Sequence, residues 1–126
     1  MPVERFGDVI YTREKEAELG GEKHTPHIEA PDKVKSGEEF EVTVIVGKDI
    51  PHPNTVEHHI KWIQVFIRED DRPHNPVHVA TFDLGPTYAE PKVTFKMRLK
   101  KSSTLYALEY CNVHGVWENS KRIEVE

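Results

Sequence analysis

The strongest constraint on the fold is a strict alternation of apolar and polar residues over residues 92–100. The apolar positions are Val93, Phe95, Met97 and Leu99. Successive side chains of a β-strand point to opposite faces of its sheet, so this pattern predicts a strand with one buried face and one solvated face. Residues 39–46 alternate in the same way and predict a second strand of this kind.

Shorter patterns predict the remaining elements. Strands are expected at residues 59–69, 77–83, 104–110 and 121–125, with a seventh near residues 27–30, and turn-forming residues separate them. The one predicted helix spans residues 12–19, before two glycines that end it. Many short strands without intervening helices favour an all-β fold, an immunoglobulin-like antiparallel β-sandwich of about seven strands, with a small barrel as the alternative.

Length and charge limit the organisation and the function. A chain of 126 residues suits one domain, expected at residues 22–126 after an N-terminal extension at residues 1–21. The net charge of −5, without a basic cluster, argues against nucleic-acid binding. No segment is apolar enough to cross a membrane and no secretory signal is present, so we expect a cytoplasmic protein.

Histidine and cysteine carry the chemistry. The chain has eight histidines and a single cysteine, Cys111, which excludes an internal disulfide. Cys111 and His114 stand three residues apart just after a strand, while His52 and His58 stand six residues apart on a loop that prolines on both sides of His52 stiffen. Each feature alone is weak, because a lone buried cysteine is commonly a small apolar residue and a surface histidine commonly has no role. Together, on loops, they indicate a metal site.

The other histidines and one acidic residue receive no functional role. His74 falls in a polar turn, His78 alternates within a strand and His59 begins one, and His27 is likewise left unassigned. Glu118 is interpreted as a solvated loop charge.

The donor set distinguishes between metals if five ligands converge. Structural zinc is satisfied by four tetrahedral ligands, whereas four neutral imidazoles and one thiolate suit a square-pyramidal iron with one open position. An open position indicates a substrate, and a thiolate ligand would donate electron density to the metal.

Three motifs stand in these segments: Glu22-Lys23-His24-x-Pro26, His52-Pro53-Asn54 with His58, and Cys111-Asn112-x-His114-Gly115-x-Trp117. Together they resemble the motifs of the one-iron superoxide reductases, also called neelaredoxins, whose iron domain is shared with desulfoferrodoxin. The sequence shows no counterpart of the small cysteine-rich iron domain of desulfoferrodoxin, since Cys111 is alone, so we expect the one-iron form.

The resemblance implies an immunoglobulin-like β-barrel holding one iron that cycles between Fe2+ and Fe3+. Its equatorial ligands would be His24, His52, His58 and His114, and its axial ligand Cys111. Glu22 would be a sixth ligand in the ferric state only, and Lys23 would attract superoxide and help deliver a proton through water. The implied reaction is one-electron reduction of superoxide to hydrogen peroxide in antioxidant defence, with rubredoxin as the external electron donor and a homotetramer as the assembly.

The sequence departs from the family pattern in three places. Thr25 and His27 stand where apolar residues are more usual, the region 68–88 is short, and the first 21 residues match no part of the pattern. None of these differences involves a ligand, but because of the last two the sequence does not predict which surface forms the oligomer.

Two other functions fit part of the pattern. A blue-copper electron carrier also uses one cysteine and a nearby histidine, but the only internal methionine, Met97, precedes Cys111 instead of following it. A non-enzymatic immunoglobulin-like binding module with a structural zinc would leave Lys23 and a fifth ligand unexplained. Metal analysis and colour would separate the three.

Overall fold

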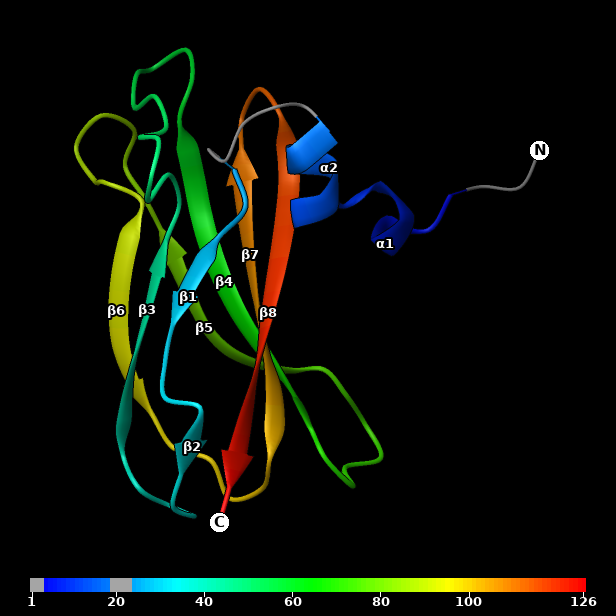
Figure 1. Ribbon diagram of the computed structural model, residues 1–126. Helices are drawn as coiled ribbons and strands as arrows, with labels where there is room; N and C mark the ends of the chain where they lie inside the picture. The colour runs from blue at the N-terminus through cyan, green and yellow to red at the C-terminus, as the bar shows by residue number, and fades with distance from the viewer. Residues whose placement is uncertain (1–3, 19–23) are drawn as a thin grey trace.

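The computed structural model describes residues 4–18 and 24–126, and this part of the chain is mostly β-strand (Figure 1). Two short helices come first, α1 (Phe6–Val9) and α2 (Arg13–Glu18). The strands that follow are β1 (His27–Glu29), β2 (Lys33–Val34), β3 (Phe40–Ile45), β4 (Ile60–Glu69), β5 (Val77–Asp83), β6 (Lys92–Met97), β7 (Ser103–Cys111) and β8 (Gly115–Val125). Within the described residues no helix has the length and apolar character needed to span a bilayer.

The strands form two sheets that pack face to face. One sheet has the order β1-β3-β6, and the other has the order β2-β8-β7-β4-β5. Their pairings are antiparallel except that of β2 with β8, which is parallel. The predicted all-β sandwich is therefore confirmed, with eight strands in the described residues where about seven were expected.

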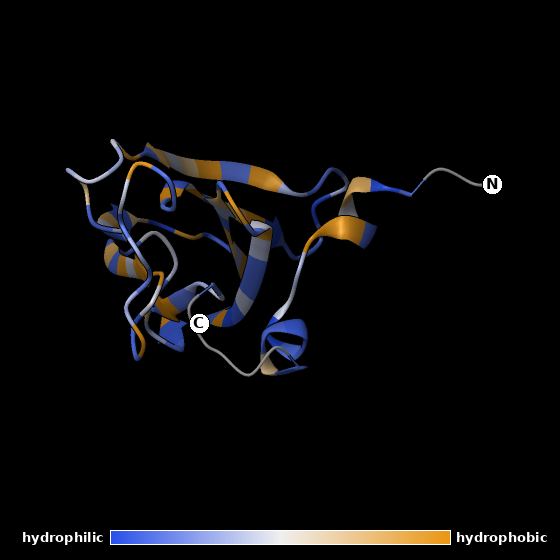
Figure 2. Ribbon diagram, turned by 90° about the horizontal axis from the view of Figure 1, so that it is seen from above, coloured by the Kyte–Doolittle hydropathy of each residue, from blue (hydrophilic) through white to orange (hydrophobic). Residues whose placement is uncertain are grey.

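The alternating residues place the core between the sheets. From the smaller sheet, Val42 and Val44 are fully buried, and Ile63, Val65 and Ala107 face them from the larger one. Figure 2 shows the matching stripes of apolar and polar residues along the strands. Apolar burial on this scale is the main stabilising contribution to a sandwich that has no disulfide.

The predicted strand boundaries hold for most elements, and β8 is the largest exception. It was expected at residues 121–125, but it begins at Gly115 and pairs along its length with β7. Residues 115–120 lack apolar alternation, so the pairing with β7 specifies this part of the strand. Glu118 accordingly lies in a strand and is partly buried, which corrects its interpretation as a solvated loop charge.

The N-terminal segment lies along the edge of β8. The Tyr11 backbone N–H donates to the Val116 carbonyl at 2.9 Å, and the Glu118 N–H donates to the Tyr11 carbonyl at 2.9 Å. Figure 1 shows α2 beside the upper end of β8, where the β7–β8 turn, the segment entering β1 and the loop before β4 also meet. This end of the sandwich is where the predicted ligands gather.

Candidate metal centre

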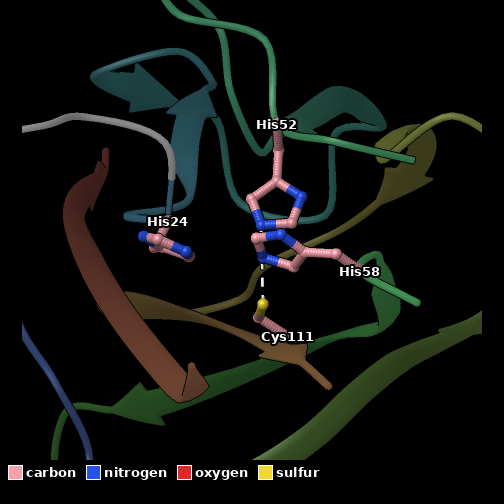
Figure 3. A group of neighbouring side chains, drawn as sticks. All are labelled: His24, His52, His58 and Cys111. Atoms are coloured by element: carbon pink, nitrogen blue, oxygen red, sulfur yellow. Dashed lines mark hydrogen bonds between the residues drawn. The ribbon is translucent and has the colours of Figure 1, made fainter. Parts of the chain in front are cut away.

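Four side chains from three separate segments converge at this end of the sandwich (Figure 3). They are His24, His52, His58 and Cys111, and their candidate ligand atoms all lie within 4.8 Å of one another. His24 precedes β1, the other two histidines lie on the loop between β3 and β4, and Cys111 ends β7. The loops thus bring together residues that are as much as 87 positions apart, which is the convergence that the sequence predicted.

His114 lies against this group and completes a ring of imidazoles. The centroid distances around the ring are 5.1 Å for His24–His52, 4.6 Å for His52–His58, 5.0 Å for His58–His114 and 4.7 Å for His114–His24. The Cys111 sulfur lies 3.5 Å from His52 Nε2 and 3.7 Å from His114 Nδ1. His114 is exposed, whereas His24, His52 and Cys111 are buried.

The tautomer of His52 is fixed by its own loop. Its Nδ1–H donates to the Pro53 carbonyl at 2.7 Å, which leaves the Nε2 lone pair facing Cys111. Burial is the main cause that lowers the pKa of His52 from 6.5 to about 4; the Pro53 hydrogen bond opposes this shift and the neighbouring histidines contribute to it. His52 is therefore neutral at pH 7, as a metal ligand must be.

The close turn before His52 depends on Gly47. Its φ is +82°, and a Cβ built there would lie 2.5 Å from the His52 backbone nitrogen. The loop can approach this closely only where the side chain is a hydrogen atom.

Asn112 joins the two loops that carry the ligands. Its Oδ1 accepts from the His59 N–H at 2.8 Å, and its Nδ2 donates to the Glu57 carbonyl at 2.9 Å. The His58 N–H donates to Thr55 Oγ1 at 3.0 Å, which tightens the same turn. His59, which received no functional role, is buried, and its ring Nδ1 lies 3.0 Å from the Thr55 carbonyl oxygen.

The environment of Cys111 disfavours a free thiolate. Burial raises the pKa of the Cys111 thiol, and the charge of Glu109 raises it as well, although backbone N–H groups of His114 and Val113 oppose this. The His114 N–H lies 3.4 Å from the sulfur. A cation at the centre would supply the positive charge that stabilises the thiolate.

Sequence reasoning missed two residues that support His24. Glu16 is buried and its carboxylate bonds the His24 ring, but it lies in a helix of mostly charged residues, where nothing distinguishes it from a solvated glutamate. Trp117 belongs to the third motif, yet its stacking on His24 could not be read from the spacing.

The remaining predicted residues lie elsewhere or outside the described part. Glu22 and Lys23 lie outside the described residues. His27 lies 3.1 Å from the Lys48 ammonium at the surface, and the exposed His78 lies 2.7 Å from Thr81 Oγ1.

The donor set fits a mononuclear iron. It combines buried imidazoles, one of them with its lone pair fixed toward the centre, and a buried cysteine whose thiolate a cation would stabilise. Structural zinc is satisfied by four tetrahedral ligands, whereas four imidazoles and a cysteine sulfur lie together here.

Comparisons with known proteins identify the family of the chain. The family model described as desulfoferrodoxin matches residues 16–120. The solved structure of a superoxide reductase (neelaredoxin) from Ignicoccus hospitalis is 51% identical, with a TM-score of 0.90 over 98% of this chain and 100% of that one. A superoxide reductase of Pyrococcus abyssi is 44% identical over 87% of this chain and 95% of its own length. A neelaredoxin of Megalodesulfovibrio gigas is 38% identical over 83% and 89%, respectively. The chain therefore belongs to the desulfoferrodoxin family.

Proposed function

We propose that this protein is a superoxide reductase with a mononuclear iron bound by His24, His52, His58, His114 and Cys111. The observation that carries the proposal is the ring of four imidazoles with one cysteine sulfur beside it. Relatives that share most of their length with this chain bear the same name, which supports the assignment of substrate.

The proposed reaction consumes one electron and two protons for each superoxide and yields hydrogen peroxide. Iron held by these ligands would supply the electron, alternating between Fe2+ and Fe3+. The buried side of the site, formed by His24, His52 and Cys111, excludes bulk water and strengthens the electrostatic interactions within it.

Glu22 and Lys23 are assigned roles by their place in the first motif, next to His24. Glu22 would add a sixth ligand in the ferric state only. Lys23 would attract the superoxide anion and help deliver a proton through water. The protein carries a net charge of −5, so local positive charge is needed to draw an anion toward the site.

The electron must come from outside the protein, because the sequence holds no second redox motif. Of the five proposed ligands, His114 is the exposed one, so we propose that the electron enters through His114. Rubredoxin as the donor, a homotetrameric assembly and a cytoplasmic location stay predictions.

The activity is tested by following both products of superoxide consumption. With iron bound and an electron donor in excess, each superoxide consumed should yield one hydrogen peroxide and no dioxygen. Release of dioxygen would instead indicate dismutation, and no acceleration over buffer would overturn the proposal. Cys111→Ser provides the inactive comparison.

A further inference from the structure

A buried carboxylate from the N-terminal helix holds His24 in place. Glu16, on α2, is 2% exposed. Its Oε1 accepts from the His24 backbone N–H at 2.6 Å and from the Thr25 N–H at 2.8 Å, and its Oε2 lies 2.8 Å from His24 Nδ1. One side chain thus fixes both the backbone and the ring of a proposed ligand.

This hydrogen bond selects the tautomer of His24. A carboxylate can only accept, so Nδ1 carries the proton and Nε2 keeps its lone pair. His24 Nε2 lies 3.1 Å from His114 Nδ1, on the side of the ring where the other donor atoms gather. Carboxylate–histidine–metal arrangements of this kind orient the ligand and raise its basicity.

The partner of His24 differs from that of His52. His52 donates to a neutral backbone carbonyl, whereas His24 donates to an acidic side chain. Within residues 4–18 and 24–126, Glu16 is the one carboxylate hydrogen-bonded to a proposed ligand. His24 should therefore be the more electron-donating of the two imidazoles.

A second set of contacts, made by Tyr11, holds the N-terminal segment next to the site. Tyr11 bridges to β8 through its backbone, and its ring lies 4.9 Å from that of Trp117. Trp117 in turn stacks on His24 at 4.8 Å. The segment 4–18 therefore reaches His24 from two directions, through Glu16 and through the Tyr11–Trp117 pair.

We propose that Glu16 is a positioning residue of the metal centre, so that the N-terminal helix is a working part of the site. The inference rests on the proposed iron-binding function. It assigns to residues 4–18 a role in setting metal affinity and reduction potential, where the sequence pattern gave this segment no role.

Glutamine at position 16 cannot reproduce the contacts of the carboxylate. An amide oxygen placed toward the two backbone N–H groups leaves the amide N–H₂ facing the protonated Nδ1, which is a clash of donors. The opposite amide orientation places donors against the backbone N–H groups instead. Either the helix shifts or His24 changes tautomer, and a His24 protonated on Nε2 cannot bind a metal through that atom.

The test compares Glu16→Gln and Glu16→Asp with Glu18→Gln, an exposed carboxylate on the same helix that pairs only with Lys15 in the described residues. Fe2+ binding is measured anaerobically against a competing chelator, and the midpoint potential is measured by redox titration of the visible band. Glu16→Gln should bind Fe2+ about 10–100-fold more weakly. Its potential should rise, because removing a negative charge disfavours the ferric state. Glu16→Asp should lie between it and the unsubstituted protein, and Glu18→Gln should change neither quantity.

Thermal unfolding of the metal-free variants separates positioning from loss of fold. If Glu16→Gln has the same Fe2+ affinity and the same midpoint potential as the unsubstituted protein, the proposed role of Glu16 is overturned. The proposed iron site would not be affected by that result. If Glu16→Gln does not fold, an unchanged potential in Glu16→Asp would overturn the role of Glu16 equally. Failure of the unsubstituted protein to bind Fe2+ would overturn the proposed function and this role together.

Discussion

The indole of Trp117 lies nearly parallel to the imidazole of His24, with 4.8 Å between ring centroids and 15° between the ring planes. Trp117 is on β8 in the larger sheet, whereas His24 precedes β1 in the smaller one. The indole Nε1–H also donates to the His114 carbonyl at 3.2 Å. One fully buried side chain therefore supports two proposed ligands and joins the two sheets at the site.

Replacing Trp117 should weaken both the fold and the metal site. Trp117→Phe keeps an aromatic ring but loses the hydrogen bond to His114 and leaves a gap, so the free energy of unfolding should fall by about 1–3 kcal/mol. Denaturant unfolding and iron content after purification measure the two effects. Trp62→Phe is the control, because Trp62 stacks on Tyr110 and is only partly buried. Equal iron loss in the two variants would contradict the support of the site by Trp117.

Gly47→Ala should destabilise the His52 loop by more than the cost of placing alanine at a positive φ. Gly37 also has a positive φ, +78°, but a Cβ there meets nothing within 4 Å, which makes Gly37→Ala the matched control. Gly37→Ala should cost about 1–2 kcal/mol of stability. Gly47→Ala should cost more, because its Cβ would lie 2.5 Å from the His52 nitrogen, and it should also reduce the iron bound. Identical losses of stability and of bound iron in the two variants would contradict this prediction, because they would show that the loop accommodates the added Cβ at position 47.

Glu109→Gln should flatten the pH dependence of stability in the metal-free protein. Glu109 is fully buried and neither of its carboxylate oxygens has a hydrogen-bond partner in the described part of the chain. Burial raises the pKa of Glu109 well above 4.5, and the charge of Glu16 raises it further. The folded state then keeps a proton that the unfolded chain has released, so stability falls as the pH rises above the unfolded pKa toward the folded one.

Urea unfolding at pH 5 and pH 8 measures this effect. The unsubstituted protein should lose more stability between these values than Glu109→Gln, whose amide does not ionise. Glu38→Gln, at an exposed position, is the control and should follow the unsubstituted protein. Parallel pH profiles for Glu109→Gln and the unsubstituted protein would contradict the raised pKa, because they require Glu109 to ionise in the folded protein as it does in the unfolded chain.

Lys23→Ala should slow the capture of superoxide and make its rate less sensitive to salt. A local positive charge concentrates an anion near the site, and salt screens that attraction. The loss in second-order rate constant at low ionic strength should be roughly ten-fold. Pulse radiolysis at several salt concentrations measures it, with Lys100→Ala, an exposed lysine in the β6–β7 connection, as the control. An unchanged rate and salt slope would remove Lys23 from the mechanism.

Much of the fold could be predicted from the sequence, because the alternation of apolar and polar residues along a strand follows from the burial of one of its faces. Residues 77–83 were predicted as a strand and form β5 with the same bounds, and residues 92–97 form β6 within the predicted 92–100. The two-residue strand β2 and the first half of β8 were not predicted. Their conformation depends on pairing with distant segments, which no local pattern records.

The residues of the site also fall into those that the sequence predicts and those that it does not. His52, His58, Cys111 and His114 could be singled out because metal-binding residue types stood at suggestive spacings on loops. Glu16 could not, since a glutamate among charged helical residues is normally solvated, and only its tertiary contacts with His24 and Thr25 set it apart. The proposed ligands can be recognised by residue type and spacing in the sequence. The contacts that orient a ligand form only when distant segments pack together, so the sequence does not reveal them.

The most direct test of the central claim is metal content measured together with the visible spectrum before and after ascorbate reduction, for the unsubstituted protein and Cys111→Ser. The thiolate-iron site predicts about one iron per chain and an absorption band of the oxidised protein that disappears on reduction and is missing in Cys111→Ser. Zinc or copper bound in preference to supplied iron, or an oxidised band that persists in Cys111→Ser, would contradict it.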